Sequence, residues 1–151
     1  MFVVAGKHCV VTGGSSGIGE QVAHILVKQG CSVTIMARGK EKLNEVLAAM
    51  ELRKTAPGQL CHAVAMDASA NYEVVEAAMK DATAHCGDID ALIHCVGTSW
   101  PLEFDVMEVG QYERMLRVNT LSAMFAARAV LPGMKRRRAG RIVFVSSAAG
   151  Q

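Results

Sequence analysis

The sequence contains no apolar run long enough to cross a membrane. Its longest mostly apolar stretch, residues 121–134, is interrupted by Ser122, Arg128 and Pro132, whereas a spanning helix needs about 20 predominantly apolar residues. An excess of charge of one sign is also missing, because 16 Lys and Arg face 14 Asp and Glu for a net charge of +2. We therefore expect no membrane span in these residues and no nucleic-acid partner.

Motifs for metal binding and for a disulfide framework are missing as well. The five cysteines are odd in number and form no C-x-x-C pair, and the five histidines show no metal-ligand spacing. This pattern predicts free, buried thiols in a reducing compartment and no metal site. The apolar start at residues 1–6 has no basic residues before it and no cleavage site, so it is not a secretory signal.

What the sequence does contain is an alternation of strand-like and helix-like segments. Hydrophobic residues make up 51% of the chain, enough for the core of one domain over residues 1–151. Strands are expected at residues 7–14, 31–38, 60–67, 89–97 and 141–146, and helices at 17–30, 41–50, 71–87 and 107–138. Continuous apolar strands joined by helices predict an α/β fold with a doubly wound parallel (Rossmann) sheet, here ending after the fifth strand.

Helical spacing predicts which residues of the first three helices face the core. The predicted inward residues are Ile18, Val22, Ile25 and Leu26 in the first helix, Leu43, Val46, Leu47 and Met50 in the second, and Val75, Ala78, Met79 and Ala82 in the third.

The segment "TGGSSGIGE", residues 12–20, joins the first predicted strand to the first helix. Gly13, Gly17 and Gly19 suit a tight turn in which the backbone approaches a pyrophosphate at the helix N-terminus, and Ser15 and Ser16 add hydroxyl donors. An ordinary glycine-rich turn is the alternative, but the strand before it and the helix after it favour a dinucleotide site. No G-K-[ST] follows, so the turn is not a P-loop of the nucleotide-triphosphate type.

Polar residues at the ends of the next strands indicate which dinucleotide binds. Arg38 follows the second strand where an NAD site usually has a carboxylate, and a guanidinium can instead hold a 2′-phosphate, helped by Lys42. We therefore predict NADP, with a solvated helix start as the alternative. Asp67 ends the third strand and either accepts a hydrogen bond from adenine or caps the next helix. Gly97 lets the backbone after the fourth strand pass close to the cofactor.

These motifs, with "VNT" around Asn119 and "GRIVFVSSAAG" at residues 140–150, occur in the order seen in the short-chain dehydrogenases/reductases. The chain resembles this family along its whole length. The resemblance implies NADP-dependent oxidoreduction of a ketone. It also implies an Asn119 that interrupts its helix and holds a water, and a Ser147 that hydrogen-bonds the substrate carbonyl. From the residues alone, a polar helix residue is the favoured interpretation of Asn119, and a strand-end turn residue is the alternative for Ser147. Carried over as cofactor contacts are Gly13, Ser15, Ser16, Gly17, Ile18, Gly19, Arg38, Lys42, Asp67 and Gly97.

Within the family, "ARGKEKL", "QYERMLRVNT" and the tail from residue 134 are most similar to the reductases of long-chain keto sphingoid bases, while bacterial-type 3-oxoacyl reductases share much of the tail. The closer resemblance implies NADPH, a lipid-like ketone and the cytosolic face of the endoplasmic reticulum in sphingolipid synthesis, with a cytoplasmic location as the alternative. The family also implies a homo-oligomer formed through long helices.

The sequence departs from the family pattern in two places. "HCVG" puts His94 where the family usually has Asn and Val96 where it has Ala, and no catalytic role is expected for His94. The Tyr-x-x-x-Lys pair, whose tyrosine is the family's proton donor, is absent, since neither Tyr72 nor Tyr112 has a lysine four residues later. We expect this pair at about position 160 of a longer protein. Residues 1–151 alone should therefore bind NADP without turnover.

Two other interpretations follow from the same residues. Read as complete, the chain is a non-catalytic NADP-binding or partner-binding protein, and its last apolar strand is an uncovered edge that favours association. The basic run at residues 134–141 could contact anionic lipids or nucleic acid, but a solvated helix C-terminus is favoured because cations are stabilised there.

Overall fold

The structure, a computed structural model that describes residues 4–147, is built on a five-stranded parallel sheet with the order β3-β2-β1-β4-β5. The strands are β1 (His8–Thr12), β2 (Ser32–Ala37), β3 (Cys61–Ala65), β4 (Ala91–His94) and β5 (Arg141–Phe144). The predicted doubly wound α/β fold is confirmed. The strand order reverses between β1 and β4, which is where ligands bind in open sheets of this kind.

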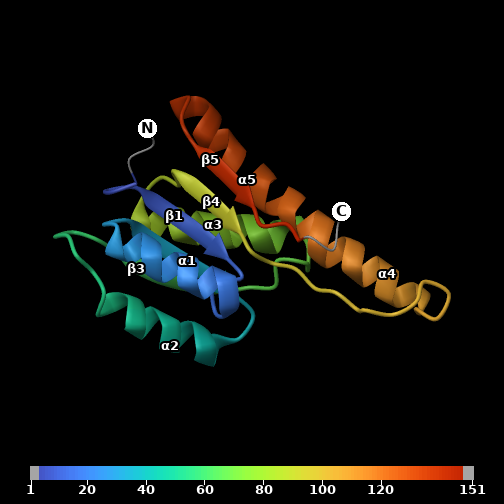
Figure 1. Ribbon diagram of the computed structural model, residues 1–151. Helices are drawn as coiled ribbons and strands as arrows, with labels where there is room; N and C mark the ends of the chain where they lie inside the picture. Colours follow the sequence, from blue (N-terminus) through green and yellow to red (C-terminus); the bar gives the residue numbers. More distant parts are fainter. Residues whose placement is uncertain (1–3, 148–151) are drawn as a thin grey trace.

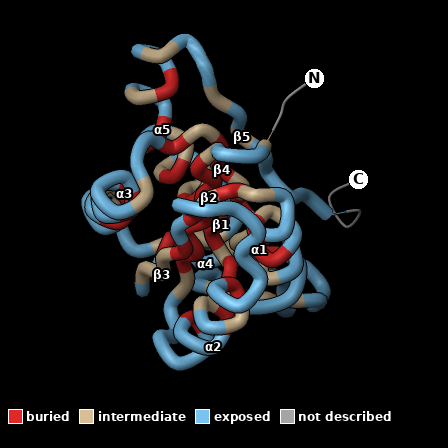
Figure 2. The backbone as a smooth tube through the Cα atoms, turned by 90° about the vertical axis from the view of Figure 1, so that its left-hand side faces the viewer, coloured by how far each residue is buried: buried red, intermediate tan, exposed pale blue. Residues whose placement is uncertain are grey.

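Helices cover both faces of the sheet (Figure 1). They are α1 (Gly17–Lys28), α2 (Lys40–Glu51), α3 (Tyr72–Cys86), α4 (Val109–Leu116), a π-helical turn η1 (Arg117–Leu121) and α5 (Ser122–Arg137). Alternate residues of β1 point to opposite faces, so Val11 packs with α1 and α2 while Val10 packs with α3 and α5. Figure 2 shows the buried residues concentrated in the central strands and the helix faces against them.

The predicted inward faces are correct for α2 and α3 and partly wrong for α1. Leu43, Val46 and Met50 are buried in α2, as are all four predicted residues of α3. In α1, however, Ile18 and Ile25 are 62% and 58% exposed. The residues that α1 buries are Gly19, Ala23, His24 and Val27, while the predicted Val22 and Leu26 are partly buried against the same core.

The single helix expected at residues 107–138 is interrupted. Its first turns form α4, the turn η1 widens to π-helical geometry over Arg117–Leu121, and α5 continues from Ser122. Asn119 lies in η1, so the interruption implied by the family resemblance is present. Lys135, Arg136 and Arg137 occupy the last turn of α5, where the helix dipole favours cations.

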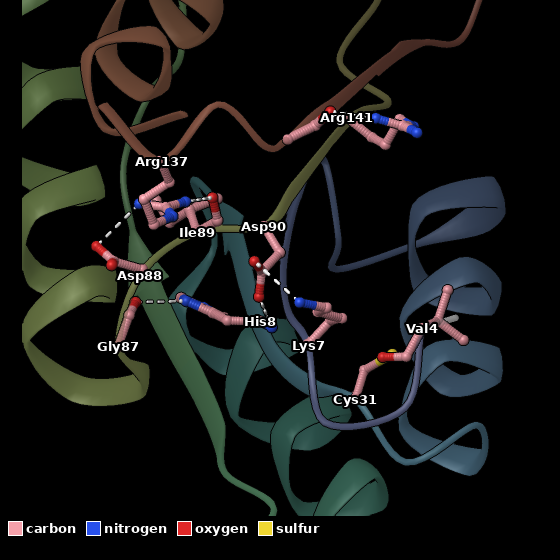
Figure 3. A network of polar contacts seen from close by, with 11 residues as sticks. Val4, Lys7, His8, Cys31, Gly87, Asp88, Ile89, Asp90, Arg137 and Arg141 are labelled. Atoms are coloured by element: carbon pink, nitrogen blue, oxygen red, sulfur yellow. Dashed lines mark hydrogen bonds and ion pairs between the residues drawn. The ribbon is translucent and has the colours of Figure 1, made fainter. Parts of the chain in front are cut away.

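The amino edge of the sheet is closed by polar contacts between the ends of four elements (Figure 3). His8 at the start of β1 donates from Nδ1 to the carbonyl of Gly87, which follows α3 (2.8 Å), and its amide donates to Asp90 (3.1 Å). Arg137 of α5 pairs with Asp88 (3.0 Å) and donates to the carbonyl of Ile89 (2.7 Å). These contacts anchor the edge opposite to the one where the predicted site residues lie.

All five cysteines are free, and Cys9, Cys31 and Cys61 are buried. Burial raises the pKa of Cys61 to about 12, so this thiol stays protonated and behaves as a small core residue. Among residues 4–147, no helix is sufficiently long and apolar to traverse a bilayer.

Candidate functional site: a glycine-rich cleft at the carboxyl edge

The loop between β1 and α1 requires glycine at three positions. Gly13 and Gly17 have φ angles of +73° and +56°, which side chains with a Cβ rarely adopt. At Gly19 a Cβ would lie 2.2 Å from the carbonyl oxygen of Gly13. The turn is therefore pressed against the first turn of α1, and a helix N-terminus of this kind offers free amides to an anion.

The carboxyl ends of β1, β2, β3 and β4 border a cavity of about 540 Å³, within the range of cofactor sites. The topology thus brings together residues that are up to 105 positions apart, from Gly13 to Val118. Nine of the ten predicted cofactor contacts line this cavity: Gly13, Ser15, Ser16, Ile18, Gly19, Arg38, Lys42, Asp67 and Gly97. Gly17 does not line it and contributes through its left-handed backbone.

Three cations border one end of the cavity. Arg38 and Lys42 come from the end of β2 and the start of α2, as predicted. Arg114 of α4 also lines the cavity and lies over the ring of Trp100, 5.8 Å from its centroid. No sequence signal pointed to Arg114, because α4 lies many residues after β4. Only the fold places Arg114 in the cavity lining, close enough to Asp67 after β3 to lower the pKa of that carboxyl. Three cations that line the same cavity as the glycine turn suit a phosphorylated dinucleotide.

Asp67 follows β3 on the same cavity wall. Its Oδ1 accepts hydrogen bonds from the amide (2.9 Å) and the hydroxyl (2.7 Å) of Ser69. Burial alone would raise the pKa of this carboxyl, but the Ser69 hydrogen bonds and the charges of Arg38 and Arg114 outweigh it and lower the pKa. The alternative of Asp67 as a helix cap is wrong, since Asn71 caps α3 by accepting from the amide of Val74.

Asn119 reaches from η1 to the segment that follows β4. Its Oδ1 accepts from the amide of Thr98 (2.8 Å) and its Nδ2 donates to the carbonyl of the same residue (2.9 Å). A Cβ added to Gly97 would lie 3.5 Å from Oδ1 of Asn119. Thr98 and Gly97 both line the cavity, so Asn119 fixes part of the cavity wall.

Ser147 lies three residues beyond the end of β5, is exposed and is not among the residues that line the cavity. The two tyrosines are engaged elsewhere: the hydroxyl of Tyr72 donates to Glu76 (3.1 Å), and that of Tyr112 donates to the carbonyl of Phe104. Within residues 4–147, therefore, neither tyrosine occupies the proton-donor position of the resembled family.

Fold, glycine turn and cation cluster together define a dinucleotide-binding domain of the doubly wound class. Residues 7–151 match the sequence profile described as short chain dehydrogenase. The chain belongs to the short-chain dehydrogenase family, and a nicotinamide dinucleotide is its cofactor class.

Among curated relatives, the chain is 42% identical over 150 residues to a 3-ketodihydrosphingosine reductase of Mus musculus, covering 99% of this chain and 45% of that protein. It is 40% identical over 146 residues to a 3-dehydrosphinganine reductase of Danio rerio, covering 97% and 44%. The chain thus spans a little under half the length of these relatives.

Solved structures agree with the fold. A short-chain type dehydrogenase/reductase from Mycobacterium ulcerans superposes with a TM-score of 0.89 at 29% identity, covering 96% of this chain and 52% of that one. The L-sorbose reductase from Gluconobacter frateurii, determined with NADPH and L-sorbose, gives a TM-score of 0.87 at 27% identity, covering 95% and 53%.

Proposed function

We propose that this chain is the cofactor-binding portion of an NADPH-dependent reductase that converts 3-ketodihydrosphingosine to dihydrosphingosine. The observation that carries the cofactor assignment is the cluster of Arg38, Lys42 and Arg114 beside the glycine cradle. The substrate assignment is supported by the relatives that bear this activity in their names at about 40% identity. The same resemblance supports a site of action at the cytosolic face of the endoplasmic reticulum.

The residues present fit this cofactor. Without Cβ atoms, Gly13 packs against the backbone of Cys95 and Gly19 packs against the backbone of Gly13. This packing holds the turn close to the first turn of α1, where a pyrophosphate would bind. Arg38 and Lys42 hold the 2′-phosphate, and Asp67 accepts a hydrogen bond from the adenine amino group. When bound, the cofactor supplies a hydride to the ketone. Ser147 donates a hydrogen bond to the ketone oxygen as negative charge develops on it, and Asn119 orders the wall beside the reacting ring.

The reaction also needs a proton donor with a pKa near neutrality. The family's Tyr-x-x-x-Lys pair, which performs this role, is absent from residues 1–151. We therefore propose that a polypeptide of these residues binds NADPH without turnover, and that the longer protein carrying the pair reduces the ketone.

The cofactor assignment is tested by titrating wild-type protein and Arg38→Gln with NADPH and NADH by isothermal titration calorimetry. We expect the substitution to weaken NADPH binding about 10–100-fold, because a charge-assisted contact to the phosphate is lost. The affinity for NADH should stay within about two-fold of wild type. Glu45→Gln, an exposed change on α2 outside the cavity, serves as the control. Equal weakening of both cofactors would contradict the assignment of Arg38 to the 2′-phosphate.

The substrate assignment is tested in the longer protein with NADPH and a panel of ketones. 3-Ketodihydrosphingosine is expected to be reduced with the highest kcat/KM. Preference for a 3-oxoacyl thioester would favour the alternative within the family, and tight NADPH binding without reduction of any ketone would favour a non-catalytic binding protein.

A further inference from the structure

A chain of buried hydrogen bonds links β1, β4 and η1 behind the cavity wall. Oγ1 of Thr12 lies 2.7 Å from Nδ1 of His94, and Nε2 of His94 lies 3.0 Å from Oγ of Ser122. The hydroxyl of Ser122 in turn donates to the carbonyl of Val118. Thr12, His94 and Ser122 are 0%, 3% and 0% exposed, so these contacts do not compete with solvent.

The carbonyl at one end of this chain sets the direction of every bond in it. Because a carbonyl only accepts, the single hydroxyl proton of Ser122 points to Val118, and its oxygen accepts from Nε2–H of His94. Nδ1 of His94 then accepts from the hydroxyl of Thr12. The ring is neutral in this arrangement, and burial lowers the pKa of His94 to about 4, which agrees with it.

The π-helical turn gives Ser122 a specific task. In an α-helix the amide of Ser122 would bond the carbonyl of Val118, four residues earlier. Here that amide donates to Arg117, five residues earlier, so the Val118 carbonyl loses its usual partner. The Ser122 hydroxyl supplies a donor in place of the lost amide, and His94 fixes the rotamer in which it does so.

The turn held in this way contributes to the cavity twice. Val118 lines the cavity directly. Asn119, the next residue, holds both backbone groups of Thr98, which is also part of the lining. A shift of η1 by one helical register would move both contacts away from the wall.

We propose that His94 is a positioning residue: through the hydroxyl of Ser122 it locks the π-helical turn in the register that places Val118 and Asn119 against the cofactor cavity. The inference deepens the proposed function and rests on it for the identity of the cofactor, NADPH. His94 touches neither cofactor nor substrate in this role.

The test compares three substitutions in the full-length protein that carries these residues. Ser122→Ala removes the hydroxyl. His94→Asn keeps an acceptor near the position of Nδ1 but is too short to reach Ser122, whereas His94→Gln places a donor near the position of Nε2. Thr34→Val is the matched control, because Thr34 is a fully buried β-strand residue bonded to a histidine, His8, at 2.9 Å, and is not among the residues that line the cavity.

Two measurements are made on each variant: the Kd for NADPH by calorimetry, and the hydrogen exchange rate of the Thr98 amide, which Asn119 protects. Ser122→Ala and His94→Asn are expected to weaken NADPH binding about 10-fold, since a misplacement of about 1 Å in a site can cost about 100-fold and a smaller shift costs less. Both are expected to speed Thr98 exchange at least about 10-fold, because the hydrogen bond from the Thr98 amide to Asn119 is weakened. His94→Gln is expected to remain within about three-fold of wild type. The double variant, Ser122→Ala with His94→Asn, should weaken NADPH binding and speed Thr98 exchange no more than either single variant, as expected for two partners in one contact.

Thr34→Val is expected to lower the melting temperature while leaving Thr98 exchange and the Kd within about two-fold of wild type. If Ser122→Ala and His94→Asn behave like Thr34→Val, or if their effects on Thr98 exchange add in the double variant, the positioning role is overturned. Should wild-type protein fail to bind NADPH, the proposed function falls, and Thr98 exchange still decides the positioning role by itself.

Discussion

At the scale of single residues, the glycine-rich turn depends on the lack of a side chain at Gly19. Gly19 has no room for a methyl group, because its Cβ would lie 2.2 Å from a backbone oxygen of Gly13. Side chains can rotate away from a clash, but two backbone segments in contact cannot. Any larger residue at Gly19 must therefore displace the turn, and the amides proposed to bind the cofactor move with it.

We expect Gly19→Ala to weaken NADPH at least about 10-fold and to lower the free energy of unfolding by about 1–3 kcal/mol, the usual range for overpacking. Calorimetry and urea denaturation measure the two effects. Gly110→Ala is the control: nothing lies within 4 Å of a Cβ there, so it should bind NADPH normally and be slightly more stable through its position in α4. Normal binding by Gly19→Ala would show that the turn is not the phosphate cradle.

The neutral ring of His94 has a consequence for acid stability. Its folded pKa is lowered to about 4 from an ordinary value of 6.5, so the unfolded chain binds more protons between these values. Stability is then intact above about pH 6.5 and is lost as the pH falls towards about 4. Near pH 4.5 the loss from this group is about 2–3 kcal/mol.

Urea denaturation at about pH 7.5 and about pH 4.5 tests this for wild-type protein and His94→Gln. Burial also lowers the pKa values of His8 and His24, and these groups contribute equally to both proteins. The decrease in the free energy of unfolding from about pH 7.5 to about pH 4.5 should therefore be larger for wild type than for the variant, by about 2–3 kcal/mol. Identical losses would mean that His94 does not titrate as a buried neutral ring.

At the scale of elements, the sequence pattern predicted every strand and the buried faces of α2 and α3, because apolar periodicity records burial directly. It was partly wrong for α1, where Val22 and Leu26 pack against the core but Ile18 and Ile25 are exposed. It missed the split between α4 and α5 as a local signal, since η1 is stabilised by tertiary contacts of Asn119 and Ser122. Arg114 could not be assigned to the site either, because only the fold brings α4 to the cavity.

The start of α3 shows how one local contact defines an element boundary. The side chain of Asn71 accepts from the amide of Val74 at 2.9 Å. Asn71→Ala should lower the free energy of unfolding by about 1 kcal/mol, the typical value of an N-cap. Asn44→Ala, an exposed position within α2, should cost nothing or stabilise slightly. Equal destabilisation by the two substitutions in urea melts would show that the cap of α3 is energetically silent.

At the scale of the whole molecule, the cavity exists because parallel strands end together. Residues after β1, β2, β3 and β4 carry no mutual signal in the sequence, yet each was predictable as a site residue from its place behind a strand. The fold places the four loops that follow these strands around one cavity. What remained unpredictable were the residues that reach this edge from outside the strand ends, such as Arg114 and Val118.

The edge at β5 behaves differently from the interior strands. Val143, Phe144 and Val145 are 49%, 51% and 40% exposed, and a parallel strand usually has both faces covered. An exposed apolar edge strand pairs readily with another chain. A polypeptide of residues 1–151 is therefore expected to self-associate through β5.

Light scattering after size-exclusion chromatography, across a range of concentrations, measures this association. Val143→Lys places a charge on the exposed edge and should shift the polypeptide towards monomer, because charged edges oppose strand pairing. Val106→Lys is the matched control, since Val106 is 63% exposed but lies in the loop before α4. If both lysine variants reduce association equally, general solubility and not the β5 edge governs it; if only Val143→Lys does, association occurs through β5.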